Sequence, residues 1–526
     1  MNYGIYGGAF DPFHNGHIEV IRGALASGLI QRLTVIPTGS PVLKSNRDLT
    51  LAPYRFFMTR KVLKDMPECV VSPVEILSRE TSYTIDTLRS IVKSENIGEE
   101  DRLFLICGAD VLFEFEKWFK PEEILETATL MVAERPGYRN DEIRAKASEI
   151  MTQFGGQVVF FPIEAVDVSS SDIRKTLDFS KVPEGVKEFI ETNDLYPADR
   201  PLDQIRDNTF EMLCEYSRTL FSEISEKRLL HSLNTAILAV RYAIRFGEDP
   251  DKAAVAGLLH DCAKELPESE MLEMAGEEGD EYSIIEMLHA PAGAQYAETR
   301  YNVREDDILK AIGYHTTGRA YMTGIDKIVY LADKLEPARK FDDLKEIRRL
   351  VETDLDAAMI ECLNAVRDSL TRKGMPFHKN SSMALAELIQ KKTSTINKEE
   401  RMNSTTTSEK IAEILTNKKA ADVEIIPVAT KTIIADYFVI ASGTSTTHVK
   451  ALADEVAYVL KNECGISPER IEGMSTARWV LLDYKDVVVH IFHPEERANY
   501  SLEKLWGTRP ADPTIVEESP ETTAES

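Results

Sequence analysis

Two histidines near the N-terminus stand in a setting suited to phosphate chemistry. The run Gly7-Gly8-Ala9-Phe10-Asp11-Pro12-Phe13-His14-Asn15-Gly16-His17 joins a short apolar segment to a helical pattern that starts near Gly16. Glycines let backbone amides approach an anion, and a helix N-terminus adds partial positive charge. His14 and His17 are three residues apart at this helix start, so their imidazoles can converge. The pattern predicts charge stabilisation at a transferring phosphoryl group.

A second set of residues has the character of metal ligands. His260 and Asp261 follow Ala256-Gly257-Leu258-Leu259, an apolar helix face on which two polar groups are costly unless they are paired or bind a metal. The same region also contains His231, His289, His315 and Asp333. Imidazole and carboxylate together suit a divalent transition metal such as Fe, Mn, Co or Zn. We expect one or two such ions here.

The C-terminal part lacks a comparable cluster, and its distinctive residues are aromatic. They are Tyr437, Trp479, Tyr500 and Trp506. Large aromatic side chains often anchor protein interfaces, so these four are candidate partner-binding residues. Core packing is the alternative for Trp479, Tyr500 and Trp506.

The elements that position these residues form three successive patterns. In residues 1–200, apolar strands alternate with helical stretches such as 16–27 and 85–94. The strands are expected at 3–7, 33–37, 103–108, 130–133 and 158–162. This alternation predicts an α/β domain with a parallel, Rossmann-like sheet covered on both faces. Residues 205–393 show apolar positions at helical spacing and predict an all-α domain.

A polar segment at 394–407 is expected to be a flexible linker. Residues 408–506 predict a second, small α/β domain, with strands at 423–427 and 437–441 and a hairpin formed by 479–484 and 487–492. The acidic residues 507–526 are expected to be a disordered tail.

The overall composition limits the class of partner. The chain has 526 residues, and 88 acidic against 62 basic side chains give a formal net charge of −26. Such a chain should not bind nucleic acid through a general basic face. Its six cysteines are scattered without a CxxC pair, which indicates reduced, structural thiols. No apolar run approaches the ~20 residues of a membrane span, so we expect a cytoplasmic protein with no membrane partner.

The first 200 residues resemble the bacterial nicotinate mononucleotide adenylyltransferases of the HxGH nucleotidyltransferase superfamily. Beyond the first motif, the matching stretches are 37–44, 81–88, 108–110 with Trp118, 135–138 and 168–174. The resemblance implies ATP, with its Mg²⁺, and nicotinate mononucleotide as substrates, and it leaves nicotinamide mononucleotide open. The catalytic residues it implies are His14, His17, Lys44 and Arg174. The substrate-binding residues it implies are Gly8, Ala9, Phe10, Thr84, Gly108, Asp110, Trp118, Arg135, Ser170 and Ser171.

Two departures from that family occur in these motifs. Val42-Leu43 replaces the usual small aromatic or proline-histidine pair before Lys44, and Ser171 replaces a threonine. The serine keeps the hydroxyl group. The first change affects how Lys44 is held.

The all-helical segment resembles the HD phosphohydrolases, and within them the family that splits diadenosine tetraphosphate into two ADP. The matching stretches are 228–232, 288–294, 314–318 and 326–337. The resemblance implies that His231, His260, Asp261 and Asp333 hold one metal, whose activated water attacks a polyphosphate phosphorus. A second metal would be held by His289 and His315, with Asp261 bridging. Lys264, one helical turn from Asp261, would bind a phosphate oxygen.

The segment from Met402 to Trp506 resembles the bacterial ribosome-silencing factors. The resemblance implies binding to a protein of the large ribosomal subunit, a block of subunit joining, and the option of a homodimer. An active nucleotidyltransferase is the rival interpretation, with Asp436 and Asp483 as a candidate acidic pair. The missing Gly-Ser motif and paired metal ligands disfavour it. For the whole chain, the alternative to a fused enzyme is a translation regulator whose upstream domains mainly sense nucleotides.

Overall fold

The computed structural model describes residues 1–39, 46–79, 83–98, 100–134, 140–164, 166–279, 287–339, 344–399, 404–432 and 434–507. The chain divides into two compact units, Met1–Ile389 and Gln390–Ser526. Among the described residues, no helix combines the length and the apolar character needed to cross a membrane. All six cysteines lie in described parts of the chain and carry free thiols.

The first unit begins with a six-stranded sheet in which all neighbouring strands run parallel. The strands are β1 (Asn2–Gly8), β2 (Arg32–Pro37), β3 (Cys69–Val71), β4 (Arg102–Gly108), β5 (Thr129–Glu134) and β6 (Val158–Pro162). Their order is β3-β2-β1-β4-β5-β6, so the winding direction reverses between β1 and β4. In doubly wound sheets, ligands bind beyond the carboxyl ends of the strands at this reversal.

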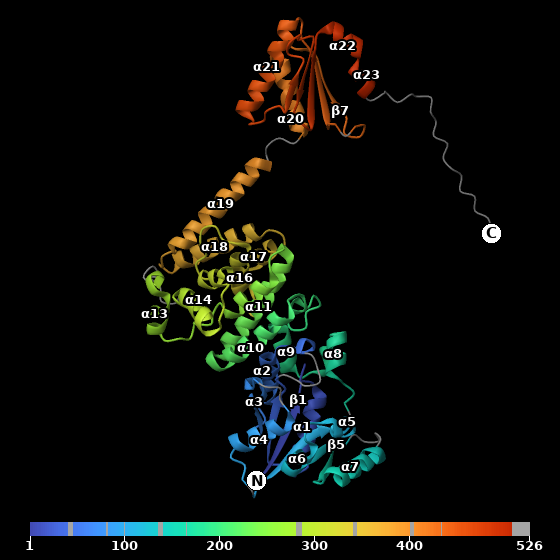
Figure 1. Ribbon diagram of the computed structural model, residues 1–526, viewed down its shortest axis with the longest axis vertical. Coiled ribbons are helices and arrows are strands. Elements are labelled where there is room, and N and C mark those ends of the chain that lie inside the picture. The colour runs from blue at the N-terminus through green and yellow to red at the C-terminus, as the bar shows by residue number, and fades with distance from the viewer. Residues whose placement is uncertain are drawn as a thin grey trace, which may run out of the picture. The chain divides into compact units, whose positions relative to one another are not determined.

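Successive side chains of these strands enter two separate cores. Ile5 and Leu105 pack in one core, and Tyr6 and Phe104 pack in the other. The helices are α1 (Asn15–Ala26), α2 (Ala52–Leu63), α3 (Val74–Leu77), α4 (Thr84–Ser94), α5 (Ala109–Glu114), α6 (Pro121–Thr127), α7 (Asn140–Phe154), α8 (Ser170–Thr176) and α9 (Glu184–Thr192). Helices α1 and α2 cover one face and α4 to α7 the other, within the blue to teal part of Figure 1. This arrangement confirms the expected α/β domain.

The rest of the first unit consists of helices and their connecting loops, with no strand among its described residues. Its helices are α10 (Asp207–Glu223), α11 (Glu226–Phe246), α12 (Pro250–Leu259), α13 (Glu268–Gly279), α14 (His289–Arg300), α15 (Asp306–Gly313), α16 (Gly324–Leu335), α17 (Lys345–Leu350), α18 (Leu355–Arg372) and the first part of α19 (Lys379–Glu399). Helix α11 packs against α12 and α16 at the centre of this part. The expected all-α domain is confirmed.

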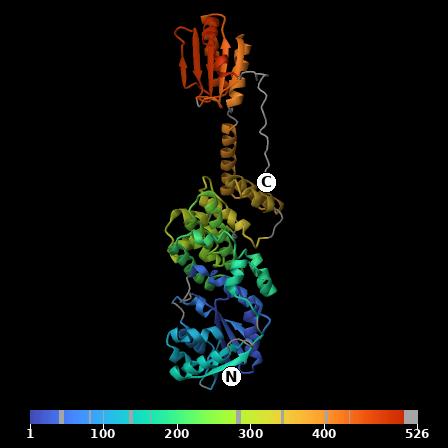
Figure 2. The same cartoon turned by 90° about the vertical axis from the view of Figure 1, so that its right-hand side faces the viewer.

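The helical part packs directly on α2 of the first domain. Figures 1 and 2 both show the two domains of the first unit side by side. The rings of Phe57 and Phe221 stack with centroids 5.5 Å apart, and Phe56 meets Phe221 edge-on at 5.1 Å. The Tyr54 hydroxyl donates a buried hydrogen bond of 2.7 Å to Asn234 Oδ1. Apolar residues of both domains therefore belong to one continuous core.

The second unit contains a five-stranded mixed sheet between two helical layers (Figure 1). The strands are β7 (Ala421–Pro427), β8 (Tyr437–Ser442), β9 (Arg470–Glu472), β10 (Trp479–Asp483) and β11 (Val487–Phe492), in the order β7-β8-β11-β10-β9. Helices α20 (Ser404–Asn417) and α21 (Thr446–Glu463) cover one face, while α22 (Pro494–Tyr500) and α23 (Leu502–Trp506) lie on the other. Strands β10 and β11 pair antiparallel, as the predicted hairpin requires.

Some elements differ from the sequence expectation. Strands β3 and β9 have three residues each, too few to show an alternating pattern, and were not predicted. The polar segment 394–407, expected to be a flexible linker, is helical in part, because α19 runs to Glu399 and α20 begins at Ser404. Lysine and glutamate are good helix formers, so polar composition alone does not end a helix. The expected tail beyond Gly507 lies outside the described residues.

The buried contact between Tyr54 and Asn234 leads to a stability prediction. We expect Tyr54→Phe to lower the free energy of unfolding of the first unit by about 1–3 kcal/mol, because Asn234 Oδ1 would lose its buried donor. Urea unfolding of the full chain measures the shift. Tyr321→Phe, at a side chain that is 79% exposed, is the control and should change this free energy by less than ~0.5 kcal/mol. Equal midpoints for both variants would contradict the assignment.

Candidate functional site

Two glycines open the first candidate site at the carboxyl edge of the sheet. Gly8 and Gly108 each lie two residues beyond the paired residues Tyr6 and Ile106, at the end of β1 and β4. A Cβ atom at Gly108 would lie 2.4 Å from Asp110 Oδ1, and one at Gly8 would lie 2.9 Å from the Phe10 ring. At Gly8 the buried Phe10 ring leaves no room for a side chain, whereas at Gly108 the exposed Asp110 side chain would have to turn away. The two glycines therefore leave the backbone bare where the winding direction reverses.

His14 and His17 meet at the start of α1. Their rings stack with centroids 3.7 Å apart, and His17 Nδ1 accepts a hydrogen bond of 3.1 Å from the His14 backbone N–H. Burial, together with the neighbouring His14, holds the pKa of His17 well below its ordinary value. His17 is therefore neutral, and its remaining proton sits on Nε2.

The Phe10 ring is part of the core and not of a substrate surface. It is 1% exposed and packs 5.0 Å from His17, centroid to centroid. Phe10 has a φ of 49°, in the left-handed region. Substrate contacts are expected from Gly8, Ala9 and Phe10. Because the Phe10 ring is buried, Phe10 can contact a substrate only through its backbone.

Helix α8 brings the last motif of the first domain against the histidine loop. The Ser169 side chain caps α8 by accepting from the Asp172 N–H at 3.1 Å. Ser170 Oγ donates to the Pro12 carbonyl at 3.0 Å, and the Arg174 guanidinium donates to the Asp11 carbonyl. The Asp11 carboxylate lies 3.6 Å from the same guanidinium. Two regions about 160 positions apart in sequence thus form one site.

The other expected residues of this site lie on α4, on α8 and in the segment from α5 to Trp118, or outside the described residues. Thr84 begins α4, and the exposed Asp110 lies in the first turn of α5. Trp118 is half-buried, with its ring 5.5 Å from that of Phe115, and Ser171 is exposed on α8. Lys44 and Arg135 lie outside the described residues.

The second candidate site gathers all six expected metal ligands from five helix ends and faces. His231 lies on α11, His260 and Asp261 follow α12, His289 begins α14, His315 follows α15 and Asp333 lies on α16. All six are buried. Helix packing brings together ligands that lie up to about 100 positions apart in the sequence.

The carboxylate of Asp261 stands between two groups of imidazoles. Its Oδ1 lies 3.0 Å from His289 Nε2 and 3.5 Å from His315 Nε2. Its Oδ2 lies 3.6 Å from His260 Nε2 and 3.8 Å from His231 Nε2. One oxygen therefore faces each group, which is the arrangement of a bridging carboxylate.

The donor set fits a divalent metal. Two triplets, His231 with His260 and Asp333, and His260 with Asp261 and His315, each have ligand atoms within 4.8 Å of one another. Nδ1 of His260 lies 2.8 Å from the Gly257 carbonyl, and Nδ1 of His315 lies 2.7 Å from the Ile312 carbonyl. Donation to these carbonyls leaves Nε2 unprotonated and aimed into the cluster, as in histidines that bind metals.

The protonation states of two of the four histidines agree with this chemistry. Burial lowers the pKa of His260 to about 3 and that of His289 to about 4, so both imidazoles are neutral and able to bind a metal. Burial favours the neutral form of His231 as well, but hydrogen bonds to Asp333 and Glu336 outweigh it and raise the pKa of His231 to about 8. Burial opposes ionisation of Asp261 and Asp333 as well. Nevertheless, the neighbouring histidines, together with Lys334 beside Asp333, hold the pKa of both carboxyl groups well below the ordinary range.

Charged side chains surround the cluster, and Lys264 is the one among them whose role the sequence predicted. Its Nζ lies 2.7 Å from His289 Nδ1 at the edge of the site. Arg228 forms an ion pair with Asp261, and Glu336 Oε1 lies 3.3 Å from His231 Nδ1. Arg228 and Glu336 were missed as site residues. The available signal was a spacing of three from an expected ligand: Arg228 precedes His231 by three positions on α11, and Glu336 follows Asp333 by three positions, just after the end of α16.

In the second unit, three of the four expected partner-binding aromatics share one face. The rings of Trp479 and Tyr500 are 4.8 Å apart, and Trp506 lies 5.5 Å from Phe438. Tyr500 is 55% exposed, whereas Trp479 and Trp506 are partly buried against the core. Tyr437 packs in the core on the opposite face of the sheet, so the structure does not bring it to this surface.

Comparison with known protein families follows the same three parts. Residues 5–176 match the family model "Cytidylyltransferase-like", 228–338 match "HD domain", and 401–526 match "Ribosomal silencing factor during starvation". The folds and sites thus define a multidomain enzyme in which a nucleotidyltransferase domain is joined to an HD-domain hydrolase, with a ribosomal silencing factor domain after them. An HD domain implies a divalent metal, and the buried cluster is the candidate site for it.

Curated relatives cover the first two parts together and separately. A Mycoplasma pneumoniae protein named "Probable nicotinate-nucleotide adenylyltransferase/Ap4A hydrolase" is 29% identical over 69% of this chain and 98% of its own length. The Bacillus subtilis "Bis(5'-nucleosyl)-tetraphosphatase, symmetrical" is 37% identical, over 29% of this chain and 85% of its own. A Clostridium botulinum "Probable nicotinate-nucleotide adenylyltransferase" is 32% identical, over 38% and 98%. The chain therefore belongs to the nicotinate-nucleotide adenylyltransferase family in its first domain and to the symmetrical bis(5'-nucleosyl)-tetraphosphatase family in its helical domain.

The ligand geometry predicts the metal content of a double variant. We expect His260→Ala combined with Asp261→Ala to remove the bound metal, because both triplets lose a shared ligand. Metal analysis of the purified full chain measures this loss. The control is His378→Ala, at the remaining histidine of the helical part, and should keep the metal. Full metal content in the double variant would refute the ligand assignment.

Proposed function

We propose that the first domain transfers adenylate from ATP to nicotinate mononucleotide, giving deamido-NAD and pyrophosphate. The observation that carries this proposal is the meeting of His14, His17, Ser170 and Arg174 at the carboxyl edge of the sheet. This edge offers bare backbone, hydroxyl groups and cations to a triphosphate. Boundaries at residues 1–200 for this domain and 205–393 for the hydrolase remain part of the proposal.

Each residue has a definable part in this transfer. A phosphate oxygen of the mononucleotide attacks the α-phosphorus of ATP, and pyrophosphate leaves, so negative charge shifts onto the leaving group. The Nε2–H of the neutral His17 donates to a phosphate oxygen rather than supplying a full positive charge. Arg174, held by the Asp11 carbonyl, supplies fixed charge, and Lys44 supplies more. No side chain acts as a nucleophile.

His17 provides the test of this site. We expect His17→Ala to lower kcat for adenylyl transfer by about 10²–10³, because a preorganised donor at the transferring group is lost. Steady-state assays of the full chain with ATP and each mononucleotide measure this and also establish the preferred substrate. His448→Ala, in the second unit, is the control. Unchanged turnover would remove His17 from the mechanism.

For the helical domain we propose symmetric cleavage of diadenosine tetraphosphate to two ADP. The supporting observation is the six-residue cluster with Asp261 between two imidazole groups. A bound divalent metal would polarise the phosphoryl group and activate water. Candidate ions are Fe, Mn, Co and Zn, one or two per site. The chain's own cations, Arg228, Lys264 and Lys334, would hold phosphate oxygens around it.

For the second unit we propose docking on a large-subunit ribosomal protein and a block of subunit joining. Tyr500 and Leu505 are 55% and 69% exposed beside the half-buried Trp479 and Trp506, which makes an apolar surface typical of interface anchors. The acidic character of the chain favours a basic protein over bare RNA.

Tyr500 tests the docking surface without disturbing the core. We expect Tyr500→Ala in the full chain to weaken co-sedimentation with large ribosomal subunits by about 2 kcal/mol, or some 30-fold in Kd. Trp506 is less suitable because its ring packs on Phe438. Tyr458→Ala, at a residue that is 67% exposed on α21, is the control. Normal binding by the Tyr500 variant would place the interface elsewhere.

A further inference from the structure

A cavity of about 780 Å³ lies where the two enzyme domains of the first unit meet. One wall comes from α2 and the end of α9, and the opposite wall comes from the start of α11 and the loop after α16. His231 and Glu336 of the metal cluster lie in its lining. The cavity therefore runs from the hydrolase site to the surface of the adenylyltransferase domain. Its volume suits a nucleotide-sized ligand.

The lining of this cavity is basic in a chain that is strongly acidic. Three cations come from the adenylyltransferase domain, namely Arg60, Lys61 and Lys64, and three from the helical domain, namely Lys227, Arg228 and Arg339. Only two lining residues, Glu226 and Glu336, are acidic. The whole chain has a formal net charge of −26, so this local excess of cations differs from the rest of the molecule. It predicts an anionic occupant.

Four of these six cations have acidic partners. Glu226 forms an ion pair with Arg60, Asp261 pairs with Arg228, and Arg339 lies 3.3 Å from Asp333 and 3.8 Å from Glu336. Lys61 pairs with Glu188 at 2.9 Å, but the Glu188 side chain is 66% exposed, and such pairs are weak. Within the described residues, Lys64 and Lys227 make no ion pair. Lysines on both walls are therefore available to an anion.

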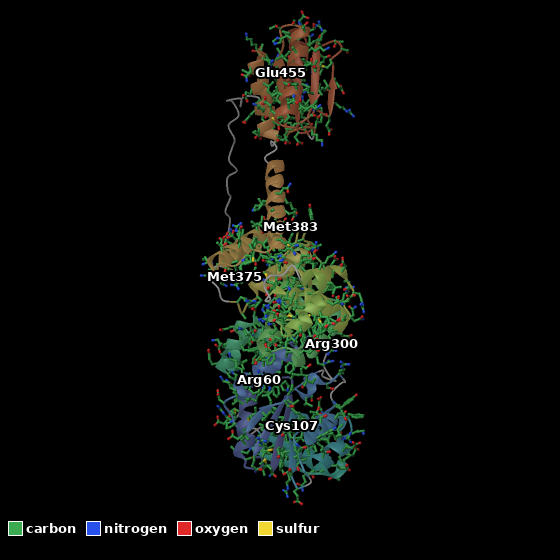
Figure 3. All side chains as sticks on the ribbon, turned by 90° about the vertical axis from the view of Figure 1, so that its left-hand side faces the viewer. Arg60, Cys107, Arg300, Met375, Met383 and Glu455 are labelled. Carbon is green, nitrogen blue, oxygen red and sulfur yellow. The ribbon has the colours of Figure 1, made fainter. Side chains whose placement is uncertain are left out.

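The adenylyltransferase wall is held firmly against the hydrolase site. Asn234 accepts from the Tyr54 hydroxyl at 2.7 Å and donates to Asn193 at 3.1 Å and to Glu336 at 3.1 Å. These buried hydrogen bonds run from α2 and α9 to the direct partner of His231. The stacked pair of Phe57 and Phe221 fixes the same helices. In Figure 3, Arg60 lies at the junction of the two domains.

We propose that Lys61 on α2 and Lys64, which directly follows α2, bind the two phosphates of the tetraphosphate chain that lie outside the metal cluster. A dinucleoside tetraphosphate carries its negative charge along the whole chain, and a symmetric cut leaves two phosphates outside the metal cluster. The basic cavity offers a binding site for these two phosphates and their nucleoside. The adenylyltransferase domain thus supplies part of the substrate site of the hydrolase. This inference rests on the proposed hydrolase activity.

The test is the double variant Lys61→Gln with Lys64→Gln in the full, metal-loaded chain. We expect KM for diadenosine tetraphosphate to rise about 10- to 100-fold, because charge-assisted contacts are lost. The value of kcat should stay within about twofold, since the metal cluster is untouched. The dependence of KM on salt should become shallower, which a merely structural role would not cause. Adenylyl transfer should be unchanged.

Lys187→Gln is the matched control, because Lys187 is an exposed lysine of α9 outside the cavity lining. An unchanged KM in the double variant, with hydrolysis intact, would overturn the inference alone. If the unaltered chain does not hydrolyse diadenosine tetraphosphate, the proposed function fails instead. Equilibrium titration with diadenosine tetraphosphate in EDTA, with deamido-NAD saturating the first site, then decides the inference. A 10-fold weaker Kd in the double variant supports it, and an equal Kd refutes it.

Discussion

Helix α2 has to satisfy two buried polar side chains at neighbouring positions, and both enzyme sites depend on how it does so. The guanidinium of Arg55, 1% exposed, donates to the carbonyls of Ala9 and Thr50 at 2.8 Å each. It thereby holds the loop that follows Gly8, at the first candidate site. Tyr54 turns the other way and donates to Asn234 beside the metal cluster. Because an unpaired buried charge or hydroxyl is costly, neither contact can be given up cheaply.

The hydrogen bond from Tyr54 to Asn234 joins the two enzyme domains of this chain. Single-domain relatives such as the Bacillus subtilis protein match only the helical part of this chain. Here the hydrolase helices bury aromatic surface against α2, and Phe57 and Phe221 belong to one core. The two domains therefore behave as one compact unit. A cavity at their boundary can take binding residues from both.

The buried candidate metal site of the helical domain shows how burial is reconciled with ionisation. Six polar ligands in an apolar helical core would be destabilising as isolated groups. Backbone carbonyls of Gly257 and Ile312 orient two of the imidazoles, while Arg228 and Lys334 balance the two aspartates. What remains at the centre is a set of nitrogen and oxygen lone pairs. In the second unit burial has the same effect as on His260 and His289, because it lowers the pKa of His490 to about 4 and keeps that ring neutral within an aromatic layer.

The sequence by itself determined the fold classes, the main strands and helices, and the motif residues that carry chemistry. Local periodicity, glycines at strand ends and a His-Asp pair on an apolar helix are signals that survive without three-dimensional information. Only the tertiary structure decided which of these residues meet. It buried the Phe10 ring and placed Tyr437 on the face opposite Trp479. It also brought Lys61 to the cavity that reaches His231, since packing between distant helices has no local signature in the chain.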